Sequence, residues 1–139
     1  MTKAQLLGFL EPQRLGVLGS ISPVGSPQSA LVGIAVTPEL EVVFDTLTNT
    51  RKYRNLRANA SACFVIGWDR EITVQFEGTS FEPQGAELDR YREIYFGVYP
   101  DGRDRLEWPG IVHLVLRPIW VRYSDYSQNP PLIEEFNFG

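Results

Sequence analysis

Short stretches in which apolar and polar residues alternate constrain the fold of this chain most strongly. From residue 72 to residue 77 every second residue is apolar, which is the pattern of a strand that buries one face of a sheet. Turn sequences rich in proline and glycine, such as residues 23–27, separate stretches of this kind at short intervals. The sequence therefore predicts six antiparallel strands, over residues 15–21, 28–36, 41–46, 62–68, 72–77 and 111–123.

The last predicted strand changes the face on which its apolar residues lie. One apolar set occupies even positions up to Leu116 and continues on odd positions from Ile119, with Pro118 between them. Because a slip of one residue turns every later side chain to the opposite face, a bulge or a sharp bend is expected there. Strands bend in this way where a sheet closes, so we expect a mainly β fold, a small six-stranded antiparallel barrel with peripheral helices.

Three segments have helical periodicity instead. They are residues 2–10 after a capping Thr2, residues 50–60 after a capping Thr50, and residues 85–97. The tail at 127–139 is too polar to form a core of its own, so it is expected to wrap the body or to pack on a partner subunit. A chain of 139 residues suits one hydrophobic core, which predicts a single domain over 1–139 whose first 12 residues hold the N-terminal helix.

The composition argues against several classes of function. One cysteine, Cys63, and one histidine, His113, are too few for a disulfide scaffold or for a metal site with several soft ligands. A net charge of −4 disfavours nucleic acid as a partner, and no apolar run approaches the roughly 18 residues of a membrane span, so a cytoplasmic protein is expected. Cys63 is expected to be a buried, inert thiol, and His113 to be exposed or at an interface.

One short segment is strongly basic in an otherwise acidic chain. Arg51, Lys52, Arg54 and Arg57 lie within seven positions without an acid, and the rest of the chain has 9 of the 13 basic residues against 17 acidic ones. Two of these cations fall in the first helical turn, where the helix dipole disfavours positive charge. Free N–H groups, the Thr50 hydroxyl and two cations together form a good receptor for a phosphate dianion. A solvated helix face whose arginines pair with distant acids explains the charge pattern equally well.

The run F-D-T-L-T-N-T-R-K at residues 44–52 is similar to a known family pattern. It resembles the sequence aromatic, any residue, Thr, short turn and Ser-Arg-Lys of pyridoxamine 5′-phosphate oxidase, and Asn55-Leu56 and Asn59-Ala60 resemble the helix that follows. The resemblance covers residues 15–81 and points to the flavin-binding split-barrel family related to that oxidase. It implies a six-stranded antiparallel split β-barrel of the FMN-binding type.

The same resemblance implies a place for each part of a bound FMN. The phosphate is expected on Arg51 and Lys52 with help from Thr50, and Thr46 is expected near the ribityl chain. One strand is expected to lie along the isoalloxazine ring, and its residues are Ser29, Ala30, Leu31 and Val32. The alternative role for this strand is to form part of the barrel core.

The resemblance further implies contacts from the fifth strand and a second subunit. The family has a ring-contacting glutamine on that strand, and counting places Thr73 there, with Gln75 next on the same face. The polar outer side of a half-buried strand is the alternative for both residues. A homodimer with the flavin at the subunit interface is also implied.

Two departures from the family pattern bear on activity. Ala30 and Ala35 stand where the oxidase strand carries an arginine and a lysine, and the region after His113 lacks the histidine of the oxidase R-x-H signature. We therefore expect an FMN-dependent oxidoreductase that acts on another small-molecule substrate or electron donor and is not an authentic pyridoxamine phosphate oxidase. A bound flavin would also explain how a chain with few catalytic side chains is an enzyme. The alternatives are a non-catalytic flavin-sensing module and a split-barrel relative that binds deazaflavin or haem.

Overall fold

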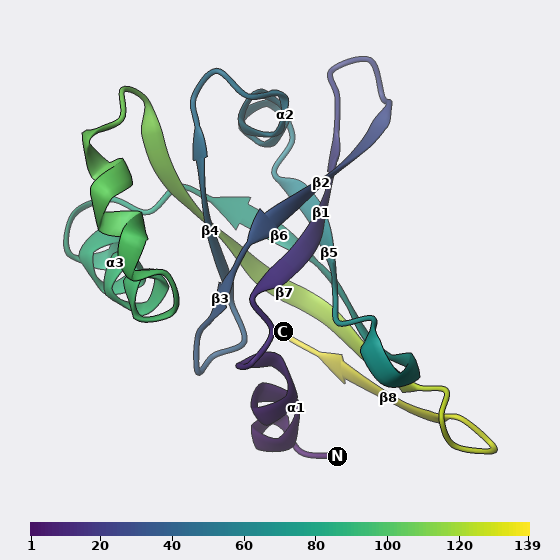
Figure 1. Ribbon diagram of the computed structural model, residues 1–139. Coiled ribbons are helices and arrows are strands. Elements are labelled where there is room, and N and C mark those ends of the chain that lie inside the picture. The colour runs from purple at the N-terminus through teal and green to yellow at the C-terminus, as the bar shows by residue number, and fades with distance from the viewer.

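One antiparallel sheet of eight strands curls around a hydrophobic core (Figure 1). The computed structural model describes all 139 residues. The strand order is β2-β1-β5-β6-β7-β4-β3, and β8 pairs with the second half of β7. The strands are β1 (Leu15–Ile21), β2 (Pro27–Gly33), β3 (Ala35–Val36), β4 (Val42–Leu47), β5 (Ser61–Ile66), β6 (Ile72–Phe81), β7 (Ile111–Asp125) and β8 (Leu132–Asn137).

The sheet closes toward a barrel because one stretch of chain lies at both of its edges. β2 pairs with β1, the chain turns at Ile34, and β3 then pairs with β4. β2 also lies beside β4 without pairing with it. This unpaired junction is the split of the barrel, so the predicted split-barrel architecture is confirmed.

The change of face in the last long strand is also confirmed. Glu77 pairs with Trp120 and Gly78 pairs with Pro118, which leaves Ile119 as the extra residue of a β-bulge. A Cβ atom at Gly78 would lie 2.2 Å from the carbonyl oxygen of Arg117, so the close approach of the two strands requires glycine there.

Three α-helices and two short 3₁₀ segments cover the sheet. The helix α1 lies at one end of the barrel and α2 near the other (Figure 1), and a Thr2–Gln5 capping box begins α1. The long helix α3 packs on the outer side of β4 and β7 over a second apolar cluster. No helix is long and apolar enough to cross a membrane. The segments are α1 (Lys3–Leu10), α2 (Arg51–Ala58), η1 (Asp69–Glu71), α3 (Gly85–Val98) and η2 (Pro100–Glu107).

The three helices are where the periodicity predicts them, but the strand count differs. Six strands are predicted and eight are present, because the bend at Ile34 divides one strand and the tail forms β8. Phe136 and Phe138 pack against the core and anchor the tail on the body, so the tail wraps its own chain.

Two predictions about single residues are wrong. His113 is only 1% exposed, because α3 covers the outer face of β7 that a free strand would show to solvent. Cys63 is exposed, because its side chain points to the outer face of β5, which no element of the chain covers. In both cases the covering of the sheet, which strand periodicity does not encode, decides the burial.

Candidate functional site

A cavity of about 410 Å³ lies at the start of α2, where β1 and β2 face the turn after β4. Arg51 and Lys52 contribute the only charges in its wall. The remaining wall is small and polar, with serine, glutamine and asparagine side chains over an apolar floor. We name this the helix-start cavity, lined by Leu18, Ser20, Gln28, Ser29, Ala30, Asn49, Thr50, Arg51 and Lys52.

Thr50 organises the turn that leads into α2. Its hydroxyl accepts a hydrogen bond from the backbone N–H of Tyr53 at 3.3 Å and donates one to the carbonyl oxygen of Leu47 at 2.9 Å. The hydroxyl of Thr46 lies 3.0 Å from the hydroxyl oxygen of Thr50. Thr46 is the donor of this hydrogen bond, because the Thr50 proton is already directed at Leu47. The N-cap residue is thereby fixed from β4, and Thr50 and the first two residues of α2 line the helix-start cavity.

The cations at the start of α2 have no carboxylate partners. Arg51, Lys52 and Arg54 form no ion pair, whereas each of four arginines on α3, η2 and β7 pairs with glutamate or aspartate: Arg90, Arg103, Arg105 and Arg117. Arg57 donates to the hydroxyl oxygen of Tyr53 at 3.0 Å. The alternative in which these arginines pair with distant acids is therefore not what the structure contains, and the positive charge stays available to an anion.

Asn55 joins the helix to the opposite wall of the cavity. Its side-chain N–H₂ donates to the Ser20 hydroxyl at 3.1 Å and to the side-chain amide oxygen of Gln28, Oε1, at 2.8 Å. The residue is 3% exposed, so both donors are used inside the protein and away from competing water. One buried amide thus sets the spacing between α2 and the strands β1 and β2.

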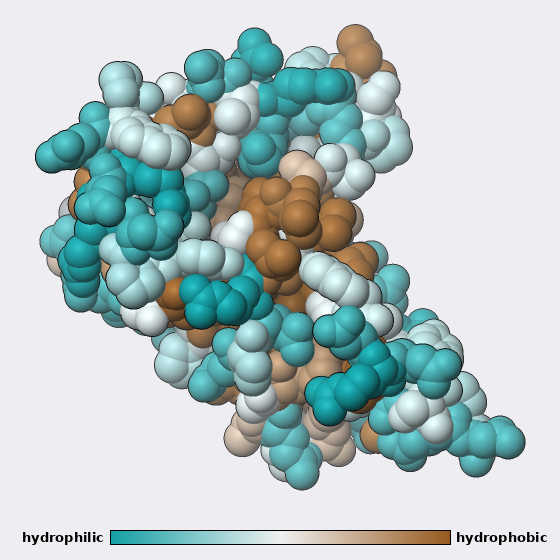
Figure 2. Space-filling view, in the orientation of Figure 1, coloured by the Kyte–Doolittle hydropathy of each residue, from teal (hydrophilic) through white to brown (hydrophobic).

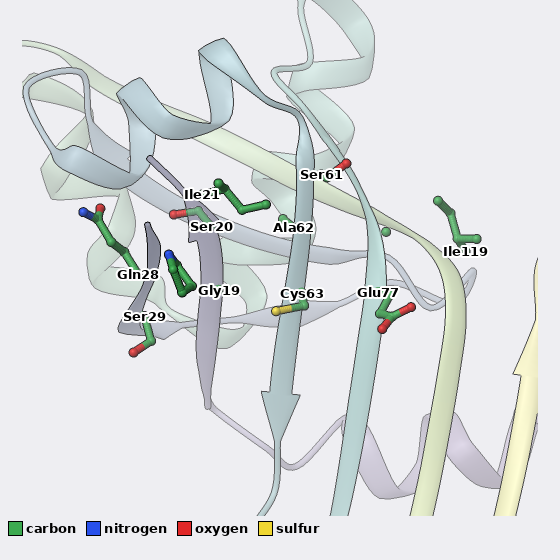
Figure 3. Close-up of a pocket in the computed structure, with 12 residues that line it drawn as sticks. Gly19, Ser20, Ile21, Gln28, Ser29, Ser61, Ala62, Cys63, Glu77 and Ile119 are labelled. Carbon is green, nitrogen blue, oxygen red and sulfur yellow. The ribbon is translucent and has the colours of Figure 1, made fainter. Parts of the chain in front are cut away.

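A second cavity of about 510 Å³ lies on the outer face of the sheet (Figure 3). The two cavities share Ser20, Gln28 and Ser29, so they adjoin at the ends of β1 and β2. We name the second one the sheet groove. It is lined by Gly19, Ser20, Ile21, Pro27, Gln28, Ser29, Ser61, Ala62, Cys63, Glu77, Gly78 and Ile119.

The floor of the sheet groove is a cross-strand row of outward-facing residues. Ser29, Gly19, Cys63 and Glu77 are paired in that order across β2, β1, β5 and β6. A Cβ atom at Gly19 would lie 2.4 Å from the Cys63 sulfur, so the glycine makes room for the thiol. Glu77 is the only carboxylate of the groove, which is otherwise uncharged and lined in part by apolar residues, a surface suited to a planar ring.

The structure brings six of the ten predicted site residues together. Ser29, Ala30, Thr50, Arg51 and Lys52 line the helix-start cavity, and Thr46 lies directly behind it.

The other four predicted residues line neither cavity. Leu31 and Gln75 face the same side of the sheet as the groove, one cross-strand row further along, and Thr73 lies two residues beyond Gln75 on β6. Val32 points inward and packs against the core, as its alternative role predicts.

Sequence reasoning missed the residues that join the two cavities. Gln28 belongs to both cavities and accepts from Asn55, and Asn49 lines the cavity at the turn before α2. A signal for Asn55 was present, since a polar amide on the apolar face of a helix needs buried partners. Nothing in the local sequence marks Glu77 as a residue of the sheet groove, because its place there depends on the β-bulge beside it.

Comparisons with known proteins agree with this geometry. The sequence model of the pyridoxamine 5′-phosphate oxidase family matches residues 2–125. No match was found among curated proteins.

Several solved structures have the same fold. A haem-binding protein from Mycobacterium smegmatis is 18% identical with a TM-score of 0.83, over 99% of this chain and 58% of that one. This chain therefore spans little more than half the length of that relative. A pyridoxamine 5′-phosphate oxidase described as putative, from Listeria innocua, is 19% identical with a TM-score of 0.74, over 87% of this chain and 96% of that one. A pyridoxamine 5′-phosphate oxidase-related, FMN-binding protein from Nostoc punctiforme is 14% identical with a TM-score of 0.66, over 99% and 93% of the two chains.

These likenesses at low identity establish the fold, and the family match over most of the sequence establishes kinship. The cations and the capped helix that the sequence singles out lie together in one cavity of that fold. The chain belongs to the pyridoxamine 5′-phosphate oxidase family.

Proposed function

We propose that this protein binds FMN, with the phosphate in the helix-start cavity and the ring toward the sheet groove. The observation that carries this proposal is the pair Arg51 and Lys52, which are unpaired and line a cavity at a capped helix start. A phosphate dianion there accepts hydrogen bonds from the helix N–H groups and from both cations. The family relative from Nostoc punctiforme is FMN-binding, which supports the choice of flavin.

The two adjoining cavities together suit this ligand. The helix-start cavity is polar and holds the two cations, whereas the sheet groove has no cation and has apolar side chains from Ile21 and Ile119 at its edge. A ligand with one polyanionic end and one large neutral ring matches this division of charge. The junction residues Gln28 and Ser29 supply amide and hydroxyl groups where a ribityl chain would cross.

We further propose an oxidoreductase whose substrate differs from pyridoxamine phosphate. A bound flavin supplies hydride or electron transfer, so the protein needs only to bind, orient and exclude water. Ala30 lines the helix-start cavity and Ala35 is 1% exposed beneath α3, so neither position offers a cation to a second phosphate. The substrate or electron donor is therefore expected to be recognised without those two charges.

A homodimer is the assembly we propose for this site. The outer sheet face exposes an apolar patch over β1, β2 and β5 (Figure 2), where Leu15, Leu31 and Val65 are 42%, 61% and 39% exposed. This patch adjoins the sheet groove through the cross-strand rows of β1, β2 and β5. A second copy on this face would bury the patch and cover the flavin ring, as the family kinship suggests.

Two alternatives make different demands on the chain. A flavin sensor uses the same cavity and differs only in lacking turnover. A haem protein with histidine ligation would need His113 at a cavity, but this side chain is buried beneath α3 and lines neither the helix-start cavity nor the sheet groove. The flavin proposal is favoured for this reason.

The double variant Arg51→Ala plus Lys52→Ala tests the proposal. Each lost charge-assisted bond contributes about 1.5–3 kcal/mol, so FMN affinity should fall by at least about 100-fold. Quenching of flavin fluorescence measures the dissociation constant. The double variant Arg54→Ala plus Arg57→Ala is the control, since it removes the same charge from the same helix outside the cavity. Equal effects of the two double variants, or none from the first, would sink the site assignment.

A further inference from the structure

The carboxylate of Asp45 connects the outer helical layer to the strand that carries the phosphate site. Its Oδ2 accepts from Arg105 Nε at 2.9 Å, and its Oδ1 accepts from the Tyr95 hydroxyl at 3.2 Å. The side chains of Arg105 and Asp45 are 20% and 15% exposed, so solvent and salt screen this ion pair little. Both carboxylate oxygens are thereby held from η2 and α3.

The same outer segment holds the turn before α2 at a second point. Gly110, three residues after η2, accepts a hydrogen bond from the backbone N–H of Thr48 at 2.9 Å. A Cβ atom at Gly110 would lie 2.7 Å from the Thr48 hydroxyl, which shows how closely the two segments meet. The stretch from Arg105 to Gly110 therefore contacts both sides of the β4 end, at Asp45 and at Thr48.

The β4 end leads directly to the phosphate site. Thr46 follows Asp45, and its hydroxyl donates to Thr50, the N-cap of α2. The strand ladder with β7 fixes the backbone of Thr46, but the Thr48–Asn49 turn beyond it pairs with no strand. This turn, and with it Thr50, is held by bonds to Thr46 and Leu47 of β4 and by the Thr48–Gly110 bond from the outer segment.

We propose that Arg105 is a positioning residue for the phosphate end of the flavin site, acting through Asp45 on the turn that carries Thr50. This inference rests on the proposed function, since it assumes that the phosphate of FMN binds at the helix-start cavity. Arg105 does not line that cavity, so its effect is indirect. It confers selectivity for the phosphorylated flavin, because the turn contacts the phosphate and not the ring.

Comparison of FMN with riboflavin in the Arg105→Gln variant tests this role. Loss of one charge-assisted contact should weaken FMN binding by about tenfold while leaving riboflavin affinity unchanged. Arg103→Gln is the matched control, because Arg103 lies on the same segment and pairs with Glu93 in an exposed ion pair. The control should bind both flavins as wild type does, which also accounts for the loss of one positive charge.

A second variant guards against a folding defect in the first. Asp45→Asn keeps the shape of the side chain and removes the charge, so it should reproduce the selective loss of FMN affinity. The double variant Arg105→Gln plus Asp45→Asn should lose no more FMN affinity than Arg105→Gln alone, because both substitutions remove the same Arg105–Asp45 ion pair.

The outcomes separate the two proposals. A folded Arg105→Gln or Asp45→Asn protein with wild-type FMN affinity, or with equal losses for FMN and riboflavin, would overturn the positioning role. Failure of Arg51→Ala plus Lys52→Ala to weaken FMN binding, with the selective loss present in Arg105→Gln, would overturn the proposed phosphate site. Wild-type protein that binds neither flavin would overturn both.

Discussion

The single histidine of this chain predicts a measurable loss of stability in weak acid. His113 lies buried between α3 and β7, with Nδ1 3.4 Å from Arg92 Nε and Nε2 without a hydrogen-bond partner. Burial lowers the pKa of His113 from 6.5 to about 4; Asp45 on β4 opposes this lowering, and Arg92 on α3 and Arg105 on η2 add to it. The native protein therefore holds His113 neutral at pH values where the unfolded chain is protonated.

The sign and size of the effect follow from linkage. The contribution is fully present above pH 6.5 and is lost as the pH falls toward 4, because the unfolded state binds the proton first. At about pH 4.5 this single group lowers the free energy of unfolding by about 2.5 kcal/mol relative to neutral pH. His113→Gln removes the titration and keeps an acceptor for Arg92.

Urea denaturation of both proteins at neutral pH and at about pH 4.5 measures the difference. Other groups titrate in both proteins, so the histidine is reported only by the change with pH of the difference in free energy of unfolding between wild type and His113→Gln. This difference should change by about 2.5 kcal/mol in favour of the variant at the lower pH. NMR of the only histidine gives its native pKa directly, and a value near 6.5 or an unchanged difference would refute the reasoning.

Two further substitutions test how the fold supports the site. Gly78→Ala places a methyl group against the carbonyl oxygen of Arg117 at the bulge and should lower the free energy of unfolding by about 2–4 kcal/mol, measured by urea denaturation. Gly97→Ala meets no atom within 4 Å inside α3 and should instead stabilise by up to about 1 kcal/mol, so equal losses in both would contradict the steric explanation. Asn55→Ala removes both hydrogen bonds from α2 to the strands and should lower the free energy of unfolding by about 1–3 kcal/mol, again measured by urea denaturation. It should also weaken FMN binding in a fluorescence titration. Unchanged FMN affinity would show that the cavity walls keep their spacing without Asn55.

The fold was largely predictable because local signals and tertiary contacts agree. Alternation predicted the strands, and the change of face around Pro118 predicted the bulge that the structure has at Ile119. The tail could not be assigned as a strand from its own composition, since β8 is stable only as an added edge on β7. The division at Ile34 was equally hidden, because it depends on which strand lies opposite each half.

The candidate site was predictable where its residues are consecutive and not where they converge. Thr50, Arg51 and Lys52 are adjacent in sequence, and one helix start brings them together. Gln28 and Asn55 are 27 residues apart, and only the packing of α2 on the strands joins them. The predicted burial of His113 and Cys63 was wrong for the same reason, since burial depends on which sheet face a helix covers.

The start of α2 departs from what stability alone would favour, and this departure points to function. Arg51 and Lys52 stand in the first turn with no acidic residue beside them, where the helix dipole opposes each cation by about 0.3–1 kcal/mol. The chain has 17 acidic residues, yet the arginines that pair with them lie on α3, η2 and β7, and none lies on α2. Natural sequences violate such local rules mainly where a bound partner compensates. A dianion at this position reverses both unfavourable terms at once, because it interacts favourably with the dipole and with the two cations. Under the proposed function, the residues that lower the stability of the free helix are the ones that bind the cofactor.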